Sequence, residues 1–245
     1  MNIATRLFLL IGILLLTGCN SQVNSAISNK DLFAFDENGQ AVIRGDITGD
    51  WACSTVDGKL RATLNIDIPV LVDGVESSVE LLFTLTFDTQ LASDQTPYTN
   101  LRDYLAANPD SSTFDAFPLF QTVEVTFTKG QWDFEALSIR QVDAVIATPE
   151  MNHILPTGIS SRGTLDGTIH GSSWGDTITW TLAVPVTVQS IQASLLIPIQ
   201  ADEDTQVVSN GSNIPMDMYH PIGNVRVEYK RTDDSLKALR FTEMP

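Results

Sequence analysis

The sequence predicts an all-β fold, an antiparallel β-sandwich or barrel of roughly ten strands with one short helix near residues 97–108. Three observations predict this class. Apolar and polar residues alternate with period two over much of the chain, which is the spacing of a strand with one buried face. Threonine dominates the polar positions and branched aliphatic residues the apolar ones, as a half-buried pleated surface favours. Tight turns that contain glycine separate several of the alternating runs.

The clearest predicted element is a long hairpin over residues 60–87. From Leu60 to Val72 the apolar residues fall on one face and the polar residues on the other. Asp73-Gly74 supplies a tight turn, and the chain returns through a second alternating run over 79–87. Pro69 interrupts the polar face, which predicts a sheet edge or a bulge at that point.

The same alternation predicts the remaining strands. An earlier strand contains Ile47, Trp51 and Cys53 with the same parity. Later strands are predicted at 122–128, 137–148, 177–188, 191–199, 225–229 and 238–242.

Two stretches break the alternation. Pro97–Asn108 has apolar residues near helical spacing and ends at Asn108-Pro109, which predicts the short helix. Ala201–Ile222 is acidic and rich in Asn, Pro and Met, which predicts a long loop.

The N-terminus carries the most specific motif of the chain. Arg6 precedes the apolar run Leu7–Leu16, which is shorter than the ~18 residues that a membrane-spanning helix needs. The run therefore predicts a secretory signal. Its end, Leu16-Thr17-Gly18-Cys19, resembles the lipobox of bacterial lipoproteins. The alternative is an uncleaved membrane helix that starts near Ile3, which the polar residues after Cys19 disfavour.

The lipoprotein resemblance implies a division of the chain. Residues 1–18 are the signal peptide, residues 19–30 the lipidated cysteine and a flexible tether, and residues 31–245 a single all-β domain. The covalent lipid on Cys19 is the only cofactor expected. Asn20 after the cysteine resembles the pattern that sorts lipoproteins to the outer membrane, on its periplasmic or surface side. In a cell with one membrane, the same anchor implies the outer face of the plasma membrane.

Charge and cysteine content exclude several classes of protein. The formal net charge of −16 repels nucleic acid and anionic lipid headgroups, so no nucleic-acid partner is expected and membrane contact rests on the anchor. The chain has two cysteines. With Cys19 lipidated, Cys53 has no partner for an internal disulfide, and we expect it to be a buried small residue.

Two tryptophans are candidate ligand-binding residues. Gly49-Asp50-Trp51 opens the first strand and resembles the Gly-x-Trp start of lipocalins. That resemblance implies an eight-stranded barrel that carries an apolar small molecule, with Trp51 closing one end. Trp174 lies in a predicted hairpin tip, where it either contacts a sugar, lipid or protein partner or folds back over the core.

The sequence contains no recognisable catalytic or metal motif. His153, His170 and His220 lack the spacing of a zinc site and are expected on the surface. Gly-x-Ser-x-Gly does not occur. Asp202-Glu203-Asp204 offers too few ligands for calcium and is interpreted as a solvated turn.

Three functions from different classes remain. The first is a non-enzymatic, lipid-anchored envelope module that binds a partner protein or supports assembly, which a filled core would favour. The second is a lipocalin-like carrier of an apolar ligand, which a cavity under Trp51 would favour. The third is a hydrolase with a carboxylate-based site, which paired buried carboxylates in a cleft would favour.

Overall fold

The computed structural model describes residues 32–56, 59–94, 97–109, 117, 121–143, 148–174, 178–216 and 223–244. Strands dominate these residues, and one α-helix, α2 (Leu101–Ala107), lies among them. The predicted all-β class and the predicted helix near 97–108 are therefore confirmed. Asn100 caps the helix by accepting a hydrogen bond from the Asp103 backbone N–H at 2.9 Å.

The strands form one continuous sheet of 13 strands in the described part of the chain, against the roughly ten predicted. The sequence did not predict the strand Arg162–Trp174, the short strand Gln90–Ala92, or two short strands, Gln206–Ser209 and Ser212–Ile214, in the segment 201–222 that it predicts as a loop. The strand predicted at 137–148 runs from Phe134 to Gln141. The strands are β1 (Gln40–Val56), β2 (Lys59–Val72), β3 (Val75–Leu85), β4 (Gln90–Ala92), β5 (Thr122–Lys129), β6 (Phe134–Gln141), β7 (Arg162–Trp174), β8 (Ile178–Val188), β9 (Ile191–Ala201), β10 (Gln206–Ser209), β11 (Ser212–Ile214), β12 (Asn224–Thr232) and β13 (Ser235–Glu243).

The first half of the sheet closes into a barrel. Strand β1 pairs with β2 and β5, β2 pairs with β3, and β5 pairs with β6, all antiparallel. A parallel pairing of β3 with β6, at Phe83 and Phe134, closes the ring of five strands. The edge strand β4 adds to β6 in parallel.

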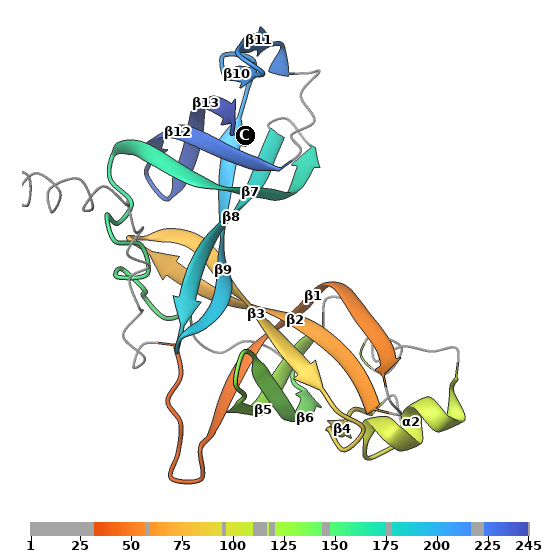
Figure 1. Cartoon of the computed structure of the whole chain (residues 1–245). Helices are drawn as coiled ribbons and strands as arrows, with labels where there is room; N and C mark the ends of the chain where they lie inside the picture. The colour runs from red at the N-terminus through yellow and green to blue at the C-terminus, as the bar shows by residue number, and fades with distance from the viewer. Residues whose placement is uncertain are drawn as a thin grey trace, which may run out of the picture.

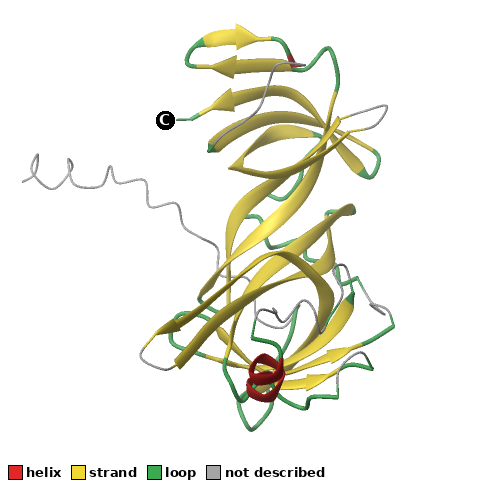
Figure 2. Ribbon diagram, turned by 90° about the vertical axis from the view of Figure 1, so that its right-hand side faces the viewer, coloured by secondary structure: helices red, strands yellow, loops and turns green. Residues whose placement is uncertain are grey.

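The second half closes in the same way. Strand β7 pairs with β8 and β12, β8 with β9, and β12 with β13, and a parallel pairing of β9 with β13 closes the ring. Strand β10 adds to β13 in parallel, as β4 does to β6. The two barrels are the lower and upper bodies of Figures 1 and 2. Each has the five-stranded Greek-key connectivity typical of an OB-fold.

The two barrels also share their strand register. Asp46 pairs with Asp67 in the first barrel, and the corresponding Thr168 pairs with Ala183 in the second. The β5–β6 and β12–β13 hairpins are each irregular at the same step, before Phe127 and before Tyr229. The chain is therefore an internal duplication at the level of structure.

Two short sequence motifs recur at corresponding places in the two barrels. Gly-x-Ile-x-Gly occurs in β1 at 45–49 and in β7 at 167–171. Asp-Thr-Gln-x-x-Ser occurs at 88–93 and at 204–209, where it forms the turn before β4 and before β10. Thr89 and Thr205 are the two buried polar residues among the described residues. Each hydroxyl donates to the backbone carbonyl of a counterpart residue, Ala136 at 3.0 Å and Ala238 at 3.2 Å.

Side chains fill both barrel interiors. In the first barrel, Phe83, Phe127 and Phe134 are fully buried and stack edge-on or tilted, with ring centroids 5.1–5.9 Å apart. Phe33, from the segment that precedes β1, packs edge-on against Phe127 at 4.9 Å. In the second barrel, Trp180 and Phe241 pack at 6.3 Å.

The barrels meet where β3 pairs antiparallel with β9. Val79 lies opposite Leu195, and these two residues are themselves counterparts in the duplication. On either side, Ser78 pairs with Leu196 and Glu80 pairs with Ser194, which are again counterpart positions. A local pseudo-twofold axis therefore passes through the Val79–Leu195 pair, as in an isologous dimer interface.

The sequence predicts one domain over 31–245, and this boundary stays a prediction. Within the described residues, one hydrophobic cluster includes core side chains of both barrels. The segment between the barrels also contacts the first one, because the Leu71 N–H donates to the Pro149 carbonyl at 2.9 Å and the Met151 N–H donates to the Leu71 carbonyl at 2.7 Å.

Candidate functional site

A row of three carboxylates crosses the outer face of the first barrel near the junction. Asp46 on β1 lies opposite Asp67 on β2, and Asp67 lies opposite Glu80 on β3. The inward neighbours Ile47, Ile66 and Leu81 are fully buried, so strand alternation turns the carboxylates outward. Like charges directly opposite each other in a sheet are destabilising. The row is therefore an energetic cost that strand pairing alone does not explain.

The two outer carboxylates have hydrogen-bond donors. The Thr122 hydroxyl donates to Asp46 Oδ1 at 2.6 Å. The Asn65 amide donates to Glu80 Oε2 at 3.3 Å, and His170 Nε2 lies 3.5 Å from the same oxygen. His170 comes from β7, so the second barrel supplies one partner of the row.

The central carboxylate differs from its neighbours. Asp67 Oδ1 and Thr48 Oγ1, on the adjacent strand, are both closed off from solvent, and the Thr48 hydroxyl is the side-chain donor that faces Asp67 within the described residues. Burial, together with the negative charges of Glu80 and Asp46, raises the pKa of Asp67 to about 6. The nearby Thr48 hydroxyl and His170 lower the pKa of Asp67 but do not offset these effects.

The second barrel shows what these positions hold when no carboxylate row is present. The counterparts of Asp46, Asp67 and Glu80 are Thr168, Ala183 and Leu196. The same strands pair in the same register there. The barrel fold therefore does not require the carboxylates of the first barrel.

Asp67 lines a cleft of about 730 Å³ to which both barrels contribute, here called the Asp67 cleft. Thr48, Ser78 and Thr148 add hydroxyl groups, and His170 and Thr181 enter from the second barrel. The apolar part of the lining consists of Pro69, Val70, Leu71, Leu196 and Pro198. Lysine and arginine are absent from its described lining.

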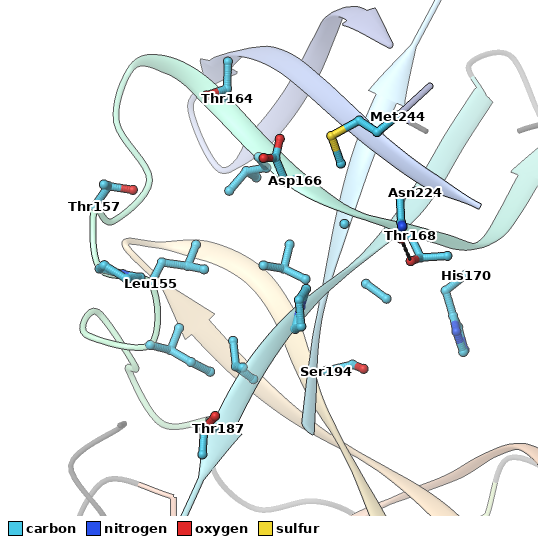
Figure 3. A pocket seen from close by; sticks show the side chains of 18 residues that line it. Leu155, Thr157, Thr164, Asp166, Thr168, His170, Thr187, Ser194, Asn224 and Met244 are labelled. Carbon is cyan, nitrogen blue, oxygen red and sulfur yellow. Dashed lines mark hydrogen bonds between the residues drawn. The ribbon is translucent and has the colours of Figure 1, made fainter. Parts of the chain in front are cut away.

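A second cleft of about 1050 Å³ lies over β7 and β8, here called the Thr168 cleft. Figure 3 shows it, with Thr168 bonded to Asn224 at 3.1 Å. Asp166 at its edge pairs with Arg226 through two hydrogen bonds of 2.7 Å. This pairing lowers the pKa of Asp166, so its charge is compensated, unlike that of Asp67. His170 lines both clefts and lies where they meet.

A third, smaller cleft of about 410 Å³ adjoins the Thr168 cleft and reflects the pseudo-twofold axis. Asn65, Glu80 and Ser194 line it, and their counterparts Thr181, Leu196 and Ser78 line the Asp67 cleft. The junction therefore carries related clefts on its two sides, and divergence has left the uncompensated carboxylate on one side.

The predicted tryptophans lie in β1 and β7, the corresponding first strands of the two barrels, but not at counterpart positions. Trp51 lies in β1, at the irregularity of pairing between Thr48 and Ala52, and Trp174 is the last residue of β7. Trp174 pairs with Ile178 beside the β7–β8 connection, which agrees with a hairpin end. The side chains of both tryptophans lie outside the described residues, so their ligand-binding roles stay predictions.

Neither cysteine side chain is among the described residues. Cys19 lies outside the described residues. Cys53 lies in β1 opposite the buried Ala62, but its side chain is outside the described part.

Sequence reasoning missed the carboxylate row and the role of His170. Asp67 and Glu80 look like any polar residues on the wet face of a hairpin, and His170 was expected to be an ordinary surface histidine. The side chain of His170 is 42% exposed, yet it faces Glu80. Its position in the Gly-x-Ile-x-Gly repeat, where the first barrel has Thr48, is the signal that could have pointed to the junction.

Within the described residues, no group of three or more His, Cys, Asp or Glu side chains is placed to hold a metal ion. No helix there is long and apolar enough to cross a membrane. The sequence matches no known protein-family model and no curated protein.

Proposed function

We propose that the chain is a lipid-anchored, non-enzymatic protein of the cell envelope that binds a partner at the junction of its two barrels. The observation that carries the binding role is the position of the clefts. They lie on the outer faces of two barrels whose interiors are filled, and they meet at His170. Open clefts beside filled cores support recognition at the surface rather than storage inside a barrel.

The anchor part of the proposal rests on the lipobox at Cys19. Three acyl chains on one cysteine would hold the protein on the bilayer effectively permanently, since two already anchor stably. Asn20 supports the outer membrane as the destination. The domain would lie on the periplasmic or surface side, or on the outer face of the plasma membrane in a cell with one membrane.

Labelled palmitate tests the anchor. Label is expected on the wild-type chain and not on a Cys19→Ala variant, and the variant should leave the membrane fraction. Asn20→Asp is the matched variant for sorting: it should keep the label but move the protein to the inner membrane. Label that persists in Cys19→Ala, or residues 1–18 still attached to the mature chain, would overturn the proposal.

Native mass spectrometry of the chain purified from its own host tests the binding role. An envelope protein that co-purifies with the wild type should be lost in Thr181→Trp, which fills the Asp67 cleft. Thr63→Trp, on the outer face of the first barrel, is the control and should retain the partner. Equal retention by both variants would remove the junction from the proposal.

A carrier role is less well supported by the geometry. Phe83, Phe127 and Phe134 occupy the first barrel, where an apolar ligand held as in lipocalins would have to lie. A lipid-sized mass retained in the same native spectra would favour the carrier over the module.

A hydrolase is the second candidate, and one observation favours it. Asp67, with its pKa raised to about 6, lies directly opposite Glu80 on the next strand, which places two carboxylates side by side, one lining the Asp67 cleft and the other the smaller cleft. Turnover of chromogenic glycosides or esters that Asp67→Asn abolishes would establish this activity. Equal rates with and without the substitution would exclude it for those substrates.

A further inference from the structure

Trp132 is the most exposed large hydrophobic side chain in the described part of the chain. Its exposed fraction is 81%, against 52% for Val42 and 44% for Leu82. It lies in the turn over residues 130–133 that joins β5 to β6, here called the Trp132 turn. An indole ring combines a large apolar surface with one N–H donor, which suits it to the boundary between a membrane and water.

We propose that the Trp132 turn is the membrane-facing end of the protein, and that the Trp132 ring lies among the headgroups of the bilayer that holds the lipid anchor. This inference rests on the proposed function, because it takes the anchor at Cys19 as given. It deepens that function by naming the surface that meets the lipid and thereby the orientation of the protein on the membrane.

The packing of Phe33 places the start of the described chain beside this turn. Its ring centroid lies 5.6 Å from that of Phe134, the residue that directly follows the turn. It lies 4.9 Å from that of Phe127, near the end of β5. The proposed tether, residues 19–31, therefore joins the first barrel next to the Trp132 turn. It spans at most about 45 Å when fully extended, so the anchor keeps the turn close to the bilayer.

Hydrogen bonds hold the Trp132 turn in one shape. The Gly130 N–H donates to the Asp133 carbonyl at 2.9 Å, and the Thr84 hydroxyl on β3 donates to the Asp133 carboxylate. Gly130 leaves room for that carboxylate, since a Cβ at this position would lie 2.5 Å from Asp133 Oδ1. Because the turn is ordered in advance, little conformational entropy is lost when Trp132 contacts the membrane.

The duplication supplies an internal comparison. Each of the two hairpins has four residues between counterpart strand pairs, 130–133 in the first barrel and 232–235 in the second. The counterpart of Trp132 is Asp234, and Asp233 precedes it. A carboxylate is costly to remove from water, so the second turn is suited to solvent. The turn itself therefore does not require an exposed tryptophan, and the barrel that follows the tether is the one that has it.

Carboxylates near the Trp132 turn determine the kind of lipid surface. Glu135 lies opposite Thr128. The Thr128 hydroxyl donates at 3.0 Å to the Gly39 carbonyl, in the exposed turn 36–39 that carries two further carboxylates. Lys129 offsets only part of this negative charge. Anionic headgroups would be repelled, so the surface that fits is a zwitterionic one.

The anchor and the tryptophan depend on each other. One aromatic side chain at the interface favours membrane contact by only about tenfold to a hundredfold, which is too little to hold a free protein. Once lipid on Cys19 keeps the protein at the bilayer, the same contact is intramolecular and gains from a high effective concentration. The tether fixes only the distance to the membrane, whereas the contact through Trp132 fixes which end of the protein faces it.

Quenching by brominated lipid tests the inference. The full chain, purified with its lipid from its own host, is reconstituted in phosphatidylcholine vesicles with or without bromine on acyl carbons near the headgroup. The chain has four tryptophans. Wild-type emission should fall by up to about a quarter in the brominated vesicles, because Trp132 reaches the headgroup level. The emission of Trp132→Gln should not fall.

A matched control places the probe on the second barrel. Asp234→Trp, made in the Trp132→Gln background, restores the number of tryptophans but adds the ring to the counterpart turn. Its added emission should be the same in both kinds of vesicle. Both substituted positions are exposed, and circular dichroism verifies that the variants are folded.

Each outcome decides the proposal. Equal quenching of the wild type and Trp132→Gln, or quenching of the ring that Asp234→Trp introduces, overturns the inference. Protection of Trp132 from aqueous acrylamide that appears only when other envelope proteins are added also overturns it, because the side chain would then belong to a protein interface. The palmitate experiment separates the two proposals. A labelled chain without quenching refutes the orientation alone, whereas an unlabelled chain removes the anchor and this inference together.

Discussion

Asp67 shows at the scale of one residue how a carboxylate can oppose folding. Its pKa is raised to about 6 in the folded chain from an ordinary value of 3.8, chiefly by burial. Between these values the native state binds more protons than the unfolded state. The free energy of unfolding therefore falls as the pH rises through this window, and the loss is complete above about pH 7.

Asp67→Asn should be more stable than the wild type at pH 7.5, by roughly 1–3 kcal/mol, because the amide is neutral. Between pH 5.0 and 7.5 the wild type should lose about 1 kcal/mol that the variant retains. Urea unfolding at both pH values measures the difference.

The range from pH 5.0 to pH 7.5 separates the titration of Asp67 from that of the other groups whose pKa is shifted. Ion pairing lowers the pKa of Asp166 and Asp202 from 3.8, and that of Glu124 from 4.5, so their contributions change only below pH 5. A variant with the same pH dependence as the wild type would refute the assignment.

Two glycines show a second residue-scale constraint, a close approach of backbone. A Cβ on Gly45 would lie 2.4 Å from the Asp67 carbonyl oxygen, and one on Gly167 would lie 2.5 Å from the Ala183 carbonyl oxygen. These are counterpart contacts in the two barrels, because β2 approaches Gly45 as closely as β8 approaches Gly167.

Gly45→Ala and Gly167→Ala should each lower the free energy of unfolding by about 2 kcal/mol or more, because backbone must move in both. Gly171→Ala is the matched control, since no atom lies within 4 Å of its added Cβ. We expect it to stay within about 0.5 kcal/mol of the wild type in chemical denaturation. Similar values for all three would contradict the argument.

At the scale of an element, the turns before β4 and β10 depend on one hydroxyl each. Thr89 Oγ1 accepts from the Thr86 N–H at 2.9 Å and donates to Ala136, and Thr205 Oγ1 accepts from the Asp202 N–H at 3.1 Å and donates to Ala238. Each threonine thereby joins a turn to the strand beside it.

Thr89→Val should cost roughly 1–3 kcal/mol, because it leaves a buried backbone donor and acceptor unpaired. Thr89→Ser keeps the hydroxyl and should cost about 1 kcal/mol or less. Denaturant unfolding gives both values, and hydrogen exchange of the Thr86 amide reports the lost bond directly. Equal costs for the two variants would show that the methyl group matters rather than the hydroxyl.

At the scale of the whole molecule, the β3–β9 pairing makes the two barrels one cooperative structure. Leu195 is fully buried at the pseudo-twofold axis, opposite Val79. Its side chain belongs to the hydrophobic cluster that both barrels share.

Leu195→Ala should therefore lower stability by about 2–5 kcal/mol and reduce hydrogen-exchange protection in both barrels. Leu82→Ala, on the partner strand β3 and 44% exposed, should cost about 1 kcal/mol or less. Loss of protection confined to the second barrel would show that the barrels unfold independently.

Most of the strands could be predicted from the sequence, but the closure of the strands into two barrels could not. The alternation in residues 60–87 and the Asp73-Gly74 turn predict the β2–β3 hairpin, because both are local signals. Barrel closure depends on parallel pairing of β3 with β6 and of β9 with β13, between strands far apart in the chain. No local pattern specifies such a pairing.

The duplication and the candidate site could not be predicted from the sequence, for related reasons. Counterparts are 122 residues apart at Gly45 and Gly167 but 102 apart at Ala136 and Ala238, so no fixed period exists. The carboxylate row joins three strands through register, and the cleft joins two barrels through the β3–β9 pairing. Neither arrangement is visible until the strands are placed side by side.

Two corresponding ion pairs, one in each barrel, affect how the chain folds into two barrels. Arg44 on β1 bonds to Glu124 on β5, and at the corresponding place Asp166 on β7 bonds to Arg226 on β12 with the signs reversed. If β5 and β12 exchanged barrels during folding, Arg44 would face Arg226 and Asp166 would face Glu124. The opposite polarity of the two pairs thus discriminates against a domain-swapped misfold between two otherwise similar halves.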